Sequence, residues 1–145
     1  MRNSSIEISN RQDSLVFDKA ALRKILRSAL SEAGRRGELS VAVVGDAEIT
    51  ELNRRFLGRD RTTDVLSFLY DSSEGRVEGE LVINAELAIR QAEKRSHSAE
   101  DELFLYAVHG ALHLLDYDDA SAAERKRMHG RALEILAACG RDVKS

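Results

Sequence analysis

The sequence predicts an α+β fold, in which a small mixed sheet of four strands packs with about five helices. Three observations lead to this class. Helical spacings of apolar residues alternate with short β-branched runs in the first half, a potential hairpin follows, and three helical segments close the chain. The 145 residues are 43% hydrophobic, include no proline and contain no segment with the composition of a linker. We therefore expect a single domain over residues 1–145.

The first elements alternate strand and helix. Apolar and polar residues alternate over 5–9, which predicts a short, half-exposed strand. Asp18 is expected to cap a helix whose apolar residues follow at helical spacing until Gly34 ends it. The run 39–44 is apolar, β-branched and flanked by glycines, so it predicts a buried strand.

A second helix and a hairpin are expected next. Asp46 is expected to cap the helix, which ends near Gly58 and turns Phe56 toward the core. Strands are predicted over 65–70 and 79–83, and the polar, glycine-containing stretch between them makes these two strands hairpin partners.

Three helices complete the predicted fold. Asn84, Ser98 and Ser121 each precede a helical segment that their side chains can cap. The segment 103–115 is apolar nearly all round, which is typical of a central helix buried on most sides.

Composition excludes several classes of protein. The formal charge of -3 argues against a chain whose whole surface binds nucleic acid or anionic lipid. The single cysteine, Cys139, excludes an intramolecular disulfide and a cysteine-rich zinc module. No uncharged apolar segment approaches the roughly 20 residues of a membrane helix, and none has the character of a signal peptide. We expect a soluble cytoplasmic protein that does not contact membranes.

Two histidines on the central helix are candidate metal ligands. His109 and His113 stand four residues apart, so their imidazoles share one face and can bind one ion. An isolated pair at this spacing is usually satisfied by hydrogen bonds, but this helix is apolar and buried histidines need a partner. A left-handed turn at Asp116 would bring Asp118 or Asp119 back toward the pair. Two histidines and a carboxylate, with one position open, are typical of a catalytic metal site.

The residues around this pair resemble the signature of the YbeY family, which comprises bacterial endoribonucleases and ribosome-maturation factors. The run HGALHLLDYDD at 109–119 is similar to the family's HGxLHLxGYDH, and the run at 52–68 is similar to LNxxYRxxDxPTDVLSF. GELVI at 79–83 resembles a third block, G-[DE]-I-x-I. The likeness spans about residues 39–138.

The resemblance implies a YbeY-type fold and metal-dependent cleavage of single-stranded RNA. It further implies a role in small-subunit ribosomal RNA maturation and ribosome quality control, with the small subunit or assembly factors as partners. One divalent ion, usually zinc, would bind His109, His113 and Asp119. Asp119 replaces a family histidine, which makes the site more anionic and lets it accept harder metals. Asp116 replaces a turn glycine, and Leu57 replaces an arginine regarded as phosphate-binding.

Four arginines gather between the second helix and the following strand, and they are the candidates for binding RNA phosphates. Arg59 and Arg61 lie in the loop, where they best replace the missing family arginine. Arg55 belongs to the helix end, where a solvated position is equally expected. Arg59 and Ser67 are the candidates for contacting substrate at the catalytic centre. Asp118 and a metal hydroxide are the candidates for the general base.

Other functions stay open at the level of the sequence. A catalytically weak ribosome-assembly factor with a structural metal is the main alternative, and Leu57 is its support. A metal-dependent hydrolase acting on another substrate is a third. Peptidase chemistry is disfavoured because Gly110 stands where the zinc-protease motif has its glutamate. His97 is expected to be a solvated loop residue. His129 flanks the apolar stripe of the last helix and could approach the metal site, although a position without a functional role is favoured.

Overall fold

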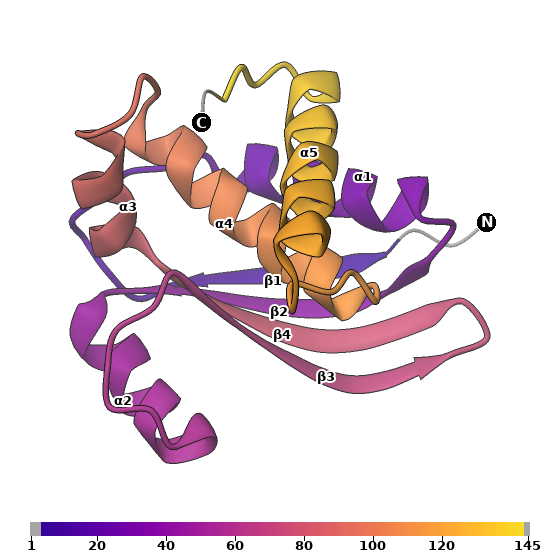
Figure 1. Ribbon diagram of the computed structural model, residues 1–145, viewed down its shortest axis with the longest axis horizontal. Helices are drawn as coiled ribbons and strands as arrows, with labels where there is room; N and C mark the ends of the chain where they lie inside the picture. Colours follow the sequence, from indigo (N-terminus) through magenta and orange to yellow (C-terminus); the bar gives the residue numbers. More distant parts are fainter. Residues whose placement is uncertain (1–3, 144–145) are drawn as a thin grey trace.

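A four-stranded mixed sheet is the base of the fold (Figure 1). The computed structural model describes residues 4–143 and orders the strands β1-β2-β4-β3. The strands are β1 (Ser5–Asn10), β2 (Arg36–Val44), β3 (Val65–Ser73) and β4 (Arg76–Asn84). β2 runs parallel to both β1 and β4, and β3 pairs antiparallel with β4 at one edge. The predicted α+β class with a small mixed sheet is therefore confirmed.

Five helices within residues 4–143 pack on this sheet. They are α1 (Lys19–Glu32), α2 (Asp46–Leu57), α3 (Ala85–Ala92), α4 (Ala99–Leu114) and α5 (Ala122–Ala138). Figure 1 shows α4 crossing one face of the sheet, with α1 and α5 on the same side and α2 on the other. Two apolar clusters result, a large one around α4 and a smaller one that joins α2 to the sheet through Ile49, Leu66 and Val82.

The central helix α4 is buried nearly all round, as its composition predicts. Phe104, Leu105 and Leu112 each expose no more than 1% of their surface. Burial of one such side chain stabilises a fold by roughly 1.5–3 kcal/mol, so packing dominates the stability of this helix. The two candidate histidines are therefore carried by one of the most firmly held elements of the protein.

Side-chain caps begin four of the helices where the sequence predicts them. Each capping oxygen accepts a hydrogen bond from the backbone N–H three residues further on. The four caps are Asp18, Asn84, Ser98 and Ser121.

The predicted cap of α2 by Asp46 is wrong. Gly45 is the N-cap residue, and Asp46 lies in the first turn without capping the helix. Its carboxylate instead accepts hydrogen bonds from Arg90 at 2.6 and 3.0 Å, from Asn84 Nδ2 at 2.8 Å and from Thr62 Oγ1 at 3.2 Å. The hydrogen bond from Arg90 is the main reason why the pKa of Asp46 falls to about 2. This carboxylate links α2 to α3, to β4 and to the loop that precedes β3.

Two further predictions from the sequence, the inward direction of Phe56 and the length of the hairpin strands, differ from the structure. Phe56 does not face the core: 59% of this residue is exposed, and its ring contacts Phe68 of β3 edge to face. β3 and β4 pair well beyond their predicted ends, up to a turn in which Glu74 and Gly75 have φ of 51° and 76°. Two consecutive positive φ values give the turn a twist that matches that of the paired strands. The polar residues on both sides of the turn can therefore pair as strands too.

Glycines let α4 approach the sheet closely. A Cβ on Gly110 would lie 2.9 Å from Val65 Cγ2 and 3.0 Å from both Leu81 Cδ2 and Ser67 Oγ. The Oγ of Ser67 also donates a hydrogen bond to the carbonyl of Gly110 at 3.0 Å. A side chain at position 110 would therefore push α4, and the histidines it carries, away from β3.

Gly110→Ala is expected to lower the free energy of unfolding by ~1–3 kcal/mol, because the new methyl group overfills a packed contact. Gly130→Ala is the matched control. Gly130 lies on α5, and within residues 4–143 open space surrounds the position that a Cβ would take, so alanine there should raise stability by ~0.5–1 kcal/mol. Urea denaturation followed by circular dichroism measures both changes. Equal stabilities for wild type and Gly110→Ala would contradict the packing described.

Candidate active site

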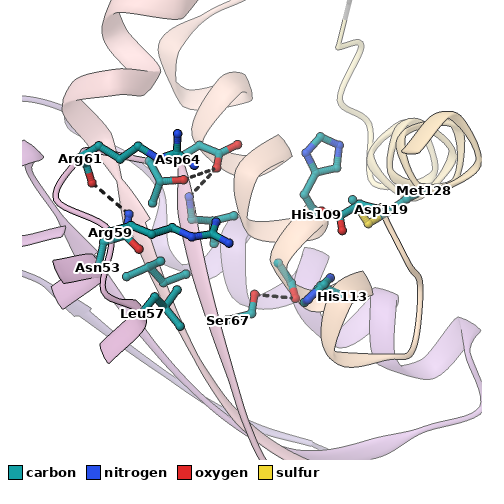
Figure 2. Close-up of a pocket in the computed structure, with 14 residues that line it drawn as sticks. Asn53, Leu57, Arg59, Arg61, Asp64, Ser67, His109, His113, Asp119 and Met128 are labelled. Atoms are coloured by element: carbon teal, nitrogen blue, oxygen red, sulfur yellow. Dashed lines mark hydrogen bonds between the residues drawn. The ribbon is translucent and has the colours of Figure 1, made fainter. Parts of the chain in front are cut away.

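A pocket of about 490 Å³ lies between α4, the end of α2 and the start of β3 (Figure 2). It brings together all three predicted metal ligands, two of the predicted arginines and Ser67. The residues that line it are Asn53, Leu57, Arg59, Arg61, Thr63, Asp64, Val65, Leu66, Ser67, His109, Gly110, His113, Asp119 and Met128.

The two histidines of α4 differ in their surroundings. His113 is exposed, whereas His109 is half-buried and its Nε2 lies 3.1 Å from Nδ1 of His129 on α5. Burial, and secondarily the neighbouring His129, lower the pKa of His109 to about 4. Within residues 4–143, no three His, Cys, Asp or Glu side chains converge closely enough to hold a metal ion. The predicted ligands thus share one pocket without forming a closed cluster.

The turn after α4 carries Asp119 back to the pocket. Asp116 has φ of 74°, the left-handed conformation expected for it, and the N–H of Tyr117 donates to the carbonyl of Leu112 at 3.1 Å. These features form a Schellman C-cap in which aspartate stands at the usual glycine position. Asp118 accepts the N–H groups of the next two residues and lines a separate cavity. Of the two aspartates that the sequence left open, Asp119 reaches the site.

The loop over residues 58–64, named here the arginine loop, is held by a buried asparagine. Asn53 is 2% exposed, its side-chain Nδ2 donates to the carbonyl of Arg61 at 3.0 Å, and its backbone carbonyl accepts from the N–H of Arg59 at 3.3 Å. Sequence reasoning assigned no role to Asn53. The available signal was an asparagine at an inward position of an amphipathic helix, because a buried amide requires partners.

The candidate phosphate-binding arginines separate into two groups. Arg59 and Arg61 line the pocket and form no ion pair within the described part of the chain. Arg55 does not line the pocket and approaches Glu51 to 3.8 Å. Leu57 lines the pocket with 52% of its surface exposed, so this side chain faces the space where a family arginine would lie.

Two polar side chains at the start of β3 also face the pocket. Asp64 accepts a hydrogen bond from the N–H of Val65 at 2.8 Å, which agrees with the predicted turn role. The hydroxyl proton of Ser67 is committed to the carbonyl of Gly110, so its oxygen is left to accept a bond from substrate or water. Ser67 therefore lies where the sequence predicts a positioning residue.

The expectation that His97 is a solvated loop residue is wrong, whereas His129 approaches the site, which the sequence left as the less favoured possibility. The His97 side chain is 1% exposed, and its Nε2 lies 2.5 Å from Oε1 of the buried Glu102. Glu102 also pairs with Arg95 at 2.7 Å, which compensates a carboxylate that would be costly to bury alone. His129 contacts His109 because α5 packs over α4, and both side chains line a second cavity. His129 and His109 lie on different helices, and His97 lies in the bend before the helix that carries Glu102, so the spacing along one helix could not reveal either contact.

The chain is similar to one protein family along most of its length. The profile of the family described as Endoribonuclease YbeY matches residues 7–140. Curated relatives named Endoribonuclease YbeY include one from Carboxydothermus hydrogenoformans, 39% identical over 92% of this chain and 96% of its own. Another, from Bacillus cytotoxicus, is 40% identical over 82% of this chain and 85% of its own.

A solved structure agrees with this similarity. The solution structure of TM1509 from Thermotoga maritima matches with a TM-score of 0.61 at 25% identity, over 92% of this chain and 90% of that one. None of the helices within residues 4–143 combines the length and the apolar character needed to cross a membrane.

The depressed pKa of His109 predicts a specific dependence of stability on pH in chelator-treated protein. Between pH 6.5 and about 4 the unfolded state binds this proton and the folded state does not, so stability falls as pH falls through that window. When the pH is lowered from 7 to 4.5, the free energy of unfolding of wild type should fall by about 2 kcal/mol more than that of His109→Gln. Urea denaturation at the two pH values measures this difference. Parallel stability profiles for the two proteins would contradict the prediction.

Proposed function

Because the chain belongs to the YbeY family, we propose that it is a metal-dependent endoribonuclease that cleaves single-stranded RNA. One observation supports this most. Two histidines and a carboxylate that can bind a divalent ion line the same pocket as Arg59 and Arg61, which have no ion-pair partner in the described chain. Phosphodiester cleavage requires both functions, a site for the ion and cations for the RNA backbone.

The donor set fits a divalent ion, and we propose zinc. His109 and His113 supply imidazole nitrogens from one face of α4, and Asp119 supplies a carboxylate from the turn that follows. The Nε2 atom of His109 lies 3.1 Å from Nδ1 of His129, so His129 is the immediate neighbour of this proposed ligand. An ion held there supplies Lewis acidity toward a phosphate oxygen and lowers the pKa of a bound water.

The other residues of the pocket bind and orient the RNA. Arg59 and Arg61 donate paired hydrogen bonds to phosphate oxygens through their planar guanidinium groups. Ser67, fixed by its bond to Gly110, offers its oxygen to substrate or water. Asp118 lines a different cavity and Arg55 lies outside the pocket, so neither is included in the proposed catalytic set.

The biological role is proposed from the family resemblance. It comprises maturation of the small-subunit ribosomal RNA and ribosome quality control in the cytoplasm, alongside the small subunit or its assembly factors. A catalytically weak assembly factor with a structural metal is the competing function. Two features favour it, the presence of Leu57 at the arginine position and the separation of the three ligand side chains.

Asp119→Asn should weaken the binding of zinc at least ~10-fold and slow RNA cleavage by a similar factor or more, because an amide is a poorer ligand than a carboxylate. Asp118→Asn is the matched control, since the amide oxygen can still accept the two backbone N–H bonds of the turn. Metal content of protein purified without metal-affinity resin, titration against a chromophoric chelator and cleavage of a labelled single-stranded RNA measure these effects. Metal below about a tenth of an equivalent, with cleavage unaffected by chelation, would oppose the proposal.

Leu57→Arg distinguishes the enzyme from the weakened assembly factor. The new guanidinium would enter the pocket beside Arg59, so a large gain in single-turnover cleavage, on the order of 10-fold or more, indicates that the native chain is catalytically weakened. A change of less than about threefold indicates that Arg59 and Arg61 already supply the phosphate contacts. Leu57→Lys controls for added charge without a planar fork.

A further inference from the structure

The end of α2 presents two apolar side chains to solvent. Phe56 and Leu57 are 59% and 52% exposed, although the sequence predicts that Phe56 faces inward. The Phe56 ring packs edge to face with Phe68 of β3, with ring centroids 5.8 Å apart and planes at 71°. This contact fixes the position of the Phe56 ring while more than half of the residue stays accessible. An aromatic ring that is both held in place and open to solvent is suited to binding a flat partner.

Leu57 belongs to the pocket described above, and Phe56 is its neighbour in the same turn of α2 without lining the pocket. Leu57 shares the pocket with Arg59 and Arg61. Figure 2 places Leu57 next to Arg59, on the side of the pocket away from His109. An RNA strand that leaves the pocket over Leu57 could reach the exposed ring of Phe56, one residue earlier in the same turn.

Charge favours RNA over an apolar protein surface as the occupant. Arg59 and Arg61 have no carboxylate partner within residues 4–143, and Arg54 and Arg55 share the single carboxylate of Glu51. An apolar protein that covered Leu57 would take these guanidinium groups from water without compensating them. A nucleotide offers a flat base for the apolar side chains and a phosphate for the arginines.

We propose that Phe56 and Leu57 form a nucleobase-binding site, in which a base of single-stranded RNA stacks on Phe56 beside the phosphate bound by Arg59. This inference rests on the proposed endoribonuclease function. It also gives a role to leucine at position 57, which contacts the base instead of a phosphate. Every base has a π face, so the site strengthens binding without selecting a sequence.

Fluorescence anisotropy with a short labelled single-stranded RNA, in chelator to prevent cleavage, tests the proposal. Phe56→Leu keeps apolar contact with Phe68 but removes the stacking ring, and it should weaken binding ~5- to 50-fold. Phe56→Tyr keeps the ring and should bind within about twofold of wild type. Val16→Ala is the control for a remote apolar side chain, since Val16 is 92% exposed, and it should leave binding unchanged.

A second set of RNAs identifies the contacted group. Each carries one abasic nucleotide, and the abasic position is moved along the strand. At the nucleotide that contacts Phe56, removing the base should weaken RNA binding by wild type but not by Phe56→Leu. The two changes remove the same contact, so their effects do not add.

The outcomes separate this inference from the function on which it rests. If wild type binds RNA and Phe56→Leu binds equally well, the base site is wrong and the endoribonuclease proposal stands. If Phe56→Leu weakens binding equally for every abasic RNA, the ring does not contact a base, which also overturns the inference. If wild type fails to bind single-stranded RNA in chelator, and also fails to bind a cleavage-resistant RNA in the presence of zinc, both proposals fail.

Discussion

The close packing of α4 on the sheet is the constraint on which the candidate site depends. Gly110 on α4 and Gly79 on β4 each have an atom of the facing element within 3.0 Å of where a Cβ would lie. Ser67 adds a hydrogen bond from β3 to the carbonyl of Gly110. His109 directly precedes this glycine, so the same contact sets how far its imidazole lies from the edge strand. Packed contacts of this kind admit little adjustment, and they give the histidines a rigid support.

The opposite wall of the pocket depends on directional polar bonds. Asn53 holds the backbone of the arginine loop through two hydrogen bonds, and the carboxylate of Asp46 joins this loop to α3 and β4 through Thr62, Arg90 and Asn84. Neutral partners and an arginine around Asp46 keep its pKa near 2, so these links persist at physiological pH. Apolar packing thus positions the candidate metal ligands, while a polar network positions the candidate phosphate ligands.

Features that depend on short spacings in the chain were predictable. The histidine pair, the four serine, aspartate or asparagine caps and the left-handed turn at Asp116 all follow from residues within one or two helical turns. Contacts between distant elements were not. His129 meets His109 because α5 packs on α4, and the exposure of Phe56 depends on how the end of α2 lies against the sheet. Neither relation has a signature in local periodicity.

By itself, the sequence determined the α+β class, the family and the chemical identity of the candidate ligands, because these depend on composition, periodicity and motif. Only the tertiary structure decided which candidates share a pocket. It brought Asp119 to the site and left Asp118 outside, and it separated Arg59 from Arg55. The reason is physical: the direction of a side chain on a turn or at a helix end is set by packing and hydrogen bonds with segments far away in the chain.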